Sequence, residues 1–221
     1  MIKIIKNEEK EGKLSFITDM STTLANAIRR SALEIPIMAV DELEITKNDS
    51  ALYDEIISHR IGLIPIKTDK TSKEVKFKLK VVGPCTVYST DIKPSVETDY
   101  KIPIVILDEE QELELVAEAR LGKGIEHIKY SPGLVYFRHN IDPEVMDFVT
   151  VDSEGKVGFN EEELKDKKIS EELLGKIKKI KTSEELEFNI ESWGQIKAKE
   201  IFLKAIEALD ENLEALNKEI K

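Results

Sequence analysis

The last segment of the chain, from Gln195 to Lys221, has the clearest periodic pattern in the sequence. Its large apolar side chains recur at alternating spacings of four and three residues: Phe202, Ile206, Leu209, Leu213, Leu216 and Ile220. This spacing places them along one narrow seam of an α-helix, as in a coiled coil. Such a helix either packs on its own domain or pairs with a helix of a partner. The narrow seam between charged flanks favours the partner.

The composition is that of an ordinary globular protein with an acidic balance. The 221 residues are 41% hydrophobic and carry a formal net charge of −11, so the chain has enough apolar mass for a core. Stand-alone DNA binding needs a basic surface that displaces counterions from phosphates, and the acidic balance argues against it. The sequence shows neither an apolar run of membrane-spanning length nor a secretory signal. We therefore expect a cytoplasmic protein.

The N-terminal part predicts a β-hairpin followed by a helix. Residues 2–6 and 13–20 alternate around a charged turn. The hydroxyls of residues 21–23 then offer an N-cap for a helix that ends before Pro36. The helical period predicts one buried stripe on this helix. Its members are Leu24, Ile28, Ser31, Ala32 and Ile35.

The middle of the chain predicts many short strands. Residues 37–46 and 75–82 alternate between apolar and polar side chains, whereas residues 53–61 could form two helical turns. Further strands are expected at 86–90, 102–107, 112–121, 133–138 and 186–191. Residues 140–183 are highly charged and predict short helices and loops. Together these elements indicate an α+β protein.

No pattern typical of an enzyme or a metal site is present. His59, His127 and His139 lie far apart in the sequence, and the single cysteine, Cys85, has no base nearby, so we interpret it as a small buried residue. The glycines of LGKG at 121–124 lack the spacing of a phosphate-binding loop and predict a structural turn. This chain alone therefore offers no support for catalysis.

Two adjacent arginines are the more informative feature. The chain contains 33 lysines and arginines, and only five are arginines; an arginine offers a planar fork where a lysine offers a mobile point charge. On the helix before Pro36, a step of about 100° per residue places Arg29 and Arg30 opposite the buried stripe, with Asn26 and Leu33 between them. This arrangement favours a protein interface. A solvated face with one exposed leucine remains the alternative.

Several sequence blocks resemble the α-like subunits of cellular RNA polymerases, in particular the archaeal D-type branch. This family includes the third-largest subunit of eukaryotic polymerase II and the N-terminal domain of bacterial α. The most specific blocks are LANAIRRSALEIPIMAVDELEI (24–45) and YDEIISHRIGLIPI (53–66). The supporting blocks are VVGPCTVYSTDIK (81–93), LVAEARLGKGIEHIKYSPG (115–133) and LEFNIESWGQIKAKEIFLKAIEAL (186–209). The matches occur in the family's order over residues 1–139 and 184–216.

The resemblance implies a discontinuous dimerisation domain and an inserted domain. Residues 1–46 and 184–221 would form the α-like dimerisation domain, with a small antiparallel sheet, helices and the long C-terminal helix. Residues 47–183 would form the inserted β-rich domain, in which 140–183 is a charged, reduced subdomain or flank. Some archaeal relatives hold an iron–sulfur cluster there. This chain has one cysteine, so we predict no cofactor and no metal.

The resemblance also implies partners and a role in transcription. The smaller α-like subunit L would form a heterodimer with this chain, on which small subunits N and P and then the second-largest and largest catalytic subunits assemble. Nucleotidyl transfer would belong to the large subunits, and DNA would be met only through the assembled complex. A homodimeric scaffold that uses the heptad seam on itself is the alternative.

The residues expected at these interfaces fall into two sets. The large-subunit interface is expected at Asn26, Arg29, Arg30, His59 and Arg60. The dimerisation surface is expected at Leu24, Ile28, Phe202, Ile206, Leu209, Leu213 and Leu216. No catalytic residue is expected.

Overall fold

The computed structural model of the chain describes residues 2–69, 71–140, 149–151, 157–159 and 185–220. Its strands are β1 (Ile2–Glu8), β2 (Lys13–Thr18), β3 (Ile37–Asn48), β4 (Val75–Val82), β5 (Cys85–Tyr88), β6 (Pro103–Leu107), β7 (Glu112–Gly122), β8 (Gly133–His139), β9 (Val149–Val151), β10 (Val157–Phe159) and β11 (Leu186–Ser192). Its α-helices are α1 (Thr22–Ser31), α2 (Asp54–Gly62) and α6 (Ala198–Ile220). Short 3₁₀ helices are η1 (Glu9–Glu11), η2 (Ala32–Glu34), η3 (Ser89–Asp91) and η4 (Ile128–Tyr130). The expected α+β class is confirmed.

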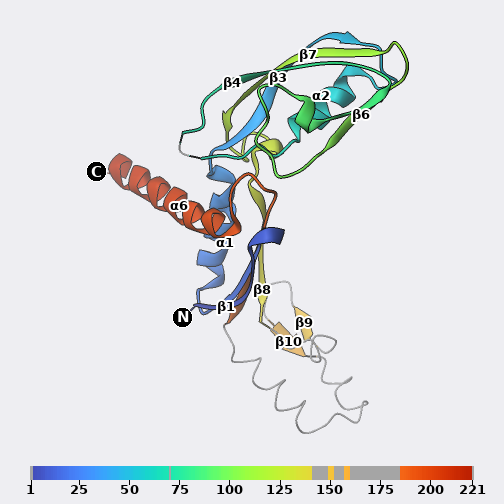
Figure 1. The fold of residues 1–221 in the computed structure, drawn as a ribbon. Helices are drawn as coiled ribbons and strands as arrows, with labels where there is room; N and C mark the ends of the chain where they lie inside the picture. Colours follow the sequence, from blue (N-terminus) through green and yellow to red (C-terminus); the bar gives the residue numbers. More distant parts are fainter. Residues whose placement is uncertain (1, 70, 141–148, 152–156, 160–184, 221) are drawn as a thin grey trace, which may run out of the picture.

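A four-stranded antiparallel sheet, in the order β1-β2-β11-β8, forms the lower part of the molecule in Figure 1. The predicted N-terminal hairpin is its β1–β2 pair. The inner face gathers three phenylalanines in one row, because Phe16, Phe188 and Phe137 are directly opposite one another on adjacent strands. Strand β8, which the sequence assigned to the inserted domain, pairs with β11 in this sheet instead.

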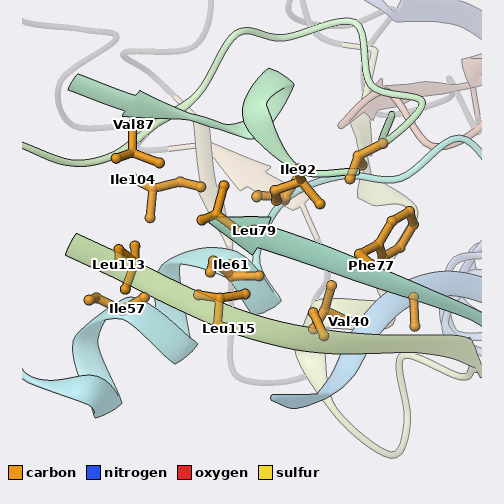
Figure 2. Packing of buried hydrophobic residues seen from close by; sticks show 14 of the residues in the cluster. Val40, Ile57, Ile61, Phe77, Leu79, Val87, Ile92, Ile104, Leu113 and Leu115 are labelled. Carbon is orange, nitrogen blue, oxygen red and sulfur yellow. The ribbon is translucent and has the colours of Figure 1, made fainter. Parts of the chain in front are cut away.

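The upper part in Figure 1 contains a three-stranded sheet, β3-β7-β4, a two-stranded sheet, β5-β6, and α2. The alternation of β4 buries Phe77 and Leu79 and exposes the lysines between them. Figure 2 shows Leu79 near Leu115 of β7, Phe77 farther along β4 towards Val40, and Ile57 of α2 next to Leu113 of β7. The predicted half-buried strand and the predicted short helix are confirmed.

Strand β3 takes part in both hydrophobic cores. Ile37 and Ala39 lie in the core under the four-stranded sheet, whereas Met38 and Val40 lie in the core of the upper part. Because side chains alternate along a strand, one strand can face two cores at once. The register with β7 shifts between Val40 and Glu42, so Asp41 is an extra, bulged residue at this junction.

Helix α1 begins as predicted, and the expected buried stripe is confirmed at Ile28, Ser31, Ala32 and Ile35 but not at Leu24. The side chain of Ser21 accepts a hydrogen bond from the backbone N–H of Leu24, which satisfies a donor of the first turn. Leu24 itself is 45% exposed, and Ala25 takes the expected place in the core beside Ile28. The expectation that Leu24 belongs to the buried stripe is therefore wrong.

The charged segment 140–183 lies largely outside the described residues. Within it, β9 and β10 form an antiparallel pair. The expectation of short helices there falls on residues that are not described. None of the helices in the described ranges combines the length and the apolar character that crossing a membrane requires.

Candidate partner-docking surfaces

The first half of α6 packs on the chain's own core. Ile201 and Ala205 are fully or almost fully buried, and Phe202 lies edge-on to two rings of the sheet below. The ring centroid of Phe202 is 5.0 Å from that of Phe16 and 5.6 Å from that of Phe188. This is a favourable aromatic geometry. Internal packing therefore accounts for the start of the heptad seam.

The second half of α6 extends away from the body of the molecule (Figure 1). Every residue from Glu211 to Ile220 is exposed, including Leu213 and Leu216 of the seam. Ile206 is also exposed, whereas Leu209 is half-buried against the core. Apolar side chains at coiled-coil spacing on a projecting helix form a surface that a second helix could cover.

Helix α1 contributes differently to this surface than expected. It packs against α6, and Ile28 is buried in the shared core. The exposed Leu24 lies in the first turn of α1. Of the two α1 residues expected at the dimerisation surface, only Leu24 presents its side chain outside the chain.

The arginines of α1 occur in two different states. Arg29 is half-buried, and its Nε and Nη2 donate to Asn26 Oδ1 at 3.1 and 2.8 Å. Arg30 is exposed and has no hydrogen-bond or ion-pair partner among the described residues. Its guanidinium fork is therefore free for an acceptor on another chain.

Leu33 is not the exposed interface leucine that the helical geometry suggested. It is half-buried, and the backbone of Gly124 lies so close that a Cβ there would come within 2.9 Å of Leu33 Cδ2. The backbone N–H of Ile125 donates to Leu33 O at 3.2 Å. The connection between β7 and β8 thus covers η2, the short 3₁₀ helix that follows α1.

His59 and Arg60 are not brought next to Arg29 and Arg30. They lie near the end of α2 in the upper part, whereas α1 belongs to the lower part (Figure 1). Both are exposed, but Arg60 Nη1 donates to the backbone oxygen of Ile104 at 2.6 Å, which ties α2 to β6. The five residues expected at the large-subunit interface therefore form two separate patches.

A polar cluster at the junction of the two cores was missed by the sequence analysis. The carboxylate of Asp41 accepts from Lys129 Nζ at 2.6 Å, from Arg120 Nε at 2.5 Å and from the hydroxyl of Tyr130 at 2.9 Å. Tyr130 is 1% exposed, and both cations also lie over its ring. Asp41 belongs to β3, Arg120 to β7, and Lys129 and Tyr130 to η4, so the cluster joins three segments of the chain.

The environment shifts two pKa values in this cluster. Hydrogen bonds from Lys129, Arg120 and Tyr130 stabilise the charged form of Asp41 and hold its pKa well below the ordinary value. Burial, together with the hydrogen bond to Asp41, raises the pKa of Tyr130 to about 12. At neutral pH the aspartate is charged and the phenol is neutral, which is the pairing that the geometry requires.

A comparison with known protein families decides the identity of the fold. The model of the RNA polymerase Rpb3/Rpb11 dimerisation domain matches residues 16–213. The chain belongs to this family. The match runs from β2 of the four-stranded sheet into the exposed half of α6. The resemblance found in the sequence is confirmed.

Individual members of the family are similar over different lengths. The DNA-directed RNA polymerase subunit Rpo3 of Pyrococcus horikoshii is 42% identical over 156 residues, which cover 63% of this chain and 60% of the relative. The subunit Rpo3 of Natronomonas pharaonis is 29% identical over 229 residues, which cover 94% and 92%. That of Halobacterium salinarum is 27% identical over 244 aligned positions, which cover 100% and 97%. The chain thus spans about three fifths of the Pyrococcus relative.

The residues of this family member do not fit an iron–sulfur cluster. Such a cluster is held by four thiolates, and the chain has one cysteine. Cys85 is half-buried rather than buried as expected, with Sγ 3.8 Å from Val82 O. In the described ranges, no three His, Cys, Asp or Glu side chains gather closely enough to hold a metal ion.

Proposed function

We propose that the chain is a non-catalytic assembly subunit of an archaeal DNA-directed RNA polymerase. It would pair with the smaller α-like subunit L and provide the platform for the other subunits. The observation that carries the proposal is the exposed second half of the heptad seam, on Leu213 and Leu216, in a chain of the Rpb3/Rpb11 dimerisation family. An apolar seam that the chain does not cover itself is a natural place for a partner helix.

The two hydrophobic cores and the arginines support separate roles for separate parts of the chain within this proposal. The core under the four-stranded sheet, α1 and α6 would be the dimerising unit, and the core around β3, β4 and β7 would be the inserted one. Arg30, with Asn26 and Arg29 beside it, would contact the second-largest subunit, and His59 with Arg60 would form a second contact. Small subunits N and P and the largest subunit would join the same platform.

Co-expression tests the proposal. We expect the chain to co-purify with subunit L and the pair to capture the second-largest subunit. A Leu213→Lys/Leu216→Lys variant should lose subunit L, because it would bury two unpaired charges. An Arg30→Glu variant should keep subunit L but lose the second-largest subunit, since charge reversal turns attraction into repulsion. Capture of both partners by both variants would refute these assignments.

A homodimeric scaffold is the second candidate. The same exposed seam on α6 favours it, since a second copy of the helix could cover it. In that case the chain would dimerise in the absence of subunit L, and the Leu213→Lys/Leu216→Lys variant would be a monomer.

A further inference from the structure

The upper part of the molecule is joined to the lower part by two neighbouring strands (Figure 1). It is one continuous stretch of chain, which begins with β3 and ends with β7. Residues 37–39 of β3 pair with residues 120–122 of β7. Strand β4 joins β7 only as far as Ala119, so these residues form a two-stranded ribbon, which we call the neck. A two-stranded ribbon has fewer ladder hydrogen bonds to resist bending than a wider sheet has.

A β-bulge lies at the upper end of the neck. The register between β3 and β7 shifts after Val40, and Asp41 is the extra residue. A bulge leaves one residue unpaired in the ladder and bends its strand. Hinges between parts of a protein take up their motion in a few residues of this kind. The neck therefore has the local structure of a hinge.

Two polar ties connect the upper and lower parts beside the neck. The first is the cluster around Asp41 described above. The second, which we call the clasp, is a chain of three hydrogen bonds. The backbone N–H of Met38 donates to Thr68 Oγ1 at 3.0 Å, and the backbone N–H of Thr68 donates to Gln195 O at 2.9 Å. Gln195 Nε2 in turn donates to Ser131 O at 3.2 Å.

The clasp joins segments from both parts of the molecule. Met38 belongs to β3, and Thr68 lies between α2 and β4 of the upper part. Gln195 precedes α6 and Ser131 precedes β8, which are elements of the lower part. All four residues are buried, with exposed fractions between 2% and 8%. Water therefore does not compete for these hydrogen bonds while the clasp is closed.

One acceptor of the clasp has no donor. The bond to Ser131 O orients the amide of Gln195, because only its nitrogen can face a carbonyl. Gln195 Oε1 is then buried without a hydrogen-bond partner among the described residues. A buried acceptor without a donor has lost its hydration and gained nothing in return. The carboxylate of Asp41, by contrast, accepts hydrogen bonds from two cations and a phenol. The clasp is therefore the weaker tie.

A cleft of about 910 Å³ borders the clasp, and Thr68 and Gln195 are among the residues that line it. Its walls come from both parts. Tyr100 of the upper part lies against Gly194 of the lower part, where a Cβ would come within 2.9 Å of Tyr100 Cε2. The two hydrophobic cores are separate clusters, so the cleft can widen without opening either core.

We infer that the neck is a pivot and that the clasp holds the upper part at one angle to the lower part. When the clasp opens, Thr68 separates from Gln195, water reaches Gln195 Oε1 and the cleft widens. The upper part then swings about the neck, where the Asp41 cluster stays closed. The inference goes beyond the proposed function, because it concerns a motion within this chain and does not depend on which partner α6 binds.

Double electron–electron resonance on the full chain tests the inference. Spin labels are attached after Ile4→Cys on β1 and Ile106→Cys on β6, at positions 61% and 69% exposed, with Cys85→Ser to remove the native thiol. Thr68→Val keeps the shape of the side chain but removes the hydroxyl that accepts from Met38, whereas Thr68→Ser keeps a hydroxyl and is the matched control.

We expect one narrow distribution of distances between the labels in the unmodified chain and in Thr68→Ser. Thr68→Val should add a second distance or broaden the distribution, because the segment that carries Thr68 is no longer fixed to β3. A broad distribution already in the unmodified chain would mean that the clasp holds no single angle. That result, or the same distribution in all three proteins, would overturn the inference.

Amide hydrogen exchange followed by NMR tests the clasp without labels. The N–H of Thr68 is bonded to Gln195 O, so it exchanges only when the clasp opens. We expect Gln195→Ala to speed this exchange about tenfold or more, as loss of one hydrogen bond does. The amide of Leu115 on the central strand β7 should exchange at an unchanged rate, since it reports unfolding of the upper core. Equal acceleration at both amides, or none at Thr68, would refute the clasp.

Discussion

The hydroxyl of Tyr130 donates a hydrogen bond of 2.9 Å to Asp41 Oδ1, and this contact joins residues that are 89 positions apart in the sequence. Asp41 is the bulged residue of β3, the strand that contributes to both hydrophobic cores. Tyr130 belongs to the connection that leads into β8 of the lower sheet. The contact therefore fixes how the connection lies against the junction of the two cores.

Replacing Asp41 by asparagine should destabilise the protein. Asp41→Asn removes the charge that pairs with Lys129 and Arg120 and leaves Lys129 largely buried without its counter-ion. We expect a loss of about 2–3 kcal/mol in the free energy of unfolding, measured by urea denaturation. The control is Glu44→Gln, on the exposed face of the same strand, which should change stability by less than about 0.5 kcal/mol. Equal midpoints for both variants would refute this role of Asp41.

The contribution of Asp41 should depend on pH in a defined direction. Folding lowers the pKa of this carboxyl, so the unfolded chain binds its proton more readily than the folded chain does. The contribution is therefore complete above the ordinary aspartate pKa of about 4 and is lost as the pH falls below it. We expect the stability difference between the wild type and Asp41→Asn to shrink between about pH 5 and pH 3. A difference that stays constant over this range would contradict the lowered pKa.

Gly122 should be intolerant of a side chain because of Tyr130. A Cβ at position 122 would lie 2.5 Å from the Tyr130 ring, whereas one at Gly62 on α2 would find its nearest neighbour, Val40 O, at 3.9 Å. We expect Gly122→Ala to lower the free energy of unfolding by about 1–3 kcal/mol through overpacking. Gly62→Ala should be neutral or stabilising, since alanine favours a helix. Thermal denaturation of the two variants checks this, and equal effects would exclude close packing at Gly122 as the cause.

The two halves of α6 should respond differently to substitution. Ile201 is fully buried in the chain's own core, so Ile201→Ala should cost about 2–4 kcal/mol of folding stability. Leu216 is exposed, so Leu216→Ala should leave the stability of the isolated chain unchanged and weaken its association with subunit L. Urea denaturation of the isolated chain and a titration with subunit L measure the two effects. Destabilisation of the isolated chain by Leu216→Ala would mean that the chain itself covers the end of α6.

The strands and helices were predictable because their patterns are local. The alternation in residues 75–82 and the N-cap hydroxyl of Ser21 act over a few positions, and both elements form where expected. In the buried stripe of α1 only Leu24 was misplaced, because the neighbouring Ala25 also fits the helical period and its small side chain gives a weaker apolar signal. Packing against α6 and the sheet places Ala25 in the core at this position, since a small residue lets the elements approach closely.

The junction cluster could not be predicted, because its contacts depend on the tertiary fold. Asp41 meets Arg120 and Tyr130 from 79 and 89 positions away, and no local pattern joins them. A signal did exist in the sequence, since Asp41 interrupts the alternation of its strand and Arg120 is one of only five arginines. The separation of Arg60 from Arg30 likewise follows from the placement of α2 beside β6, which spacing along the chain does not reveal.

The central claim is that the exposed seam of α6 is a pairing surface for a smaller α-like subunit. Size-exclusion chromatography with multi-angle light scattering, on the chain alone and after mixing with subunit L, tests it most directly. The account predicts a single complex of one chain and one subunit L. A chain of 25.1 kDa that remains a monodisperse monomer in the presence of subunit L would contradict it.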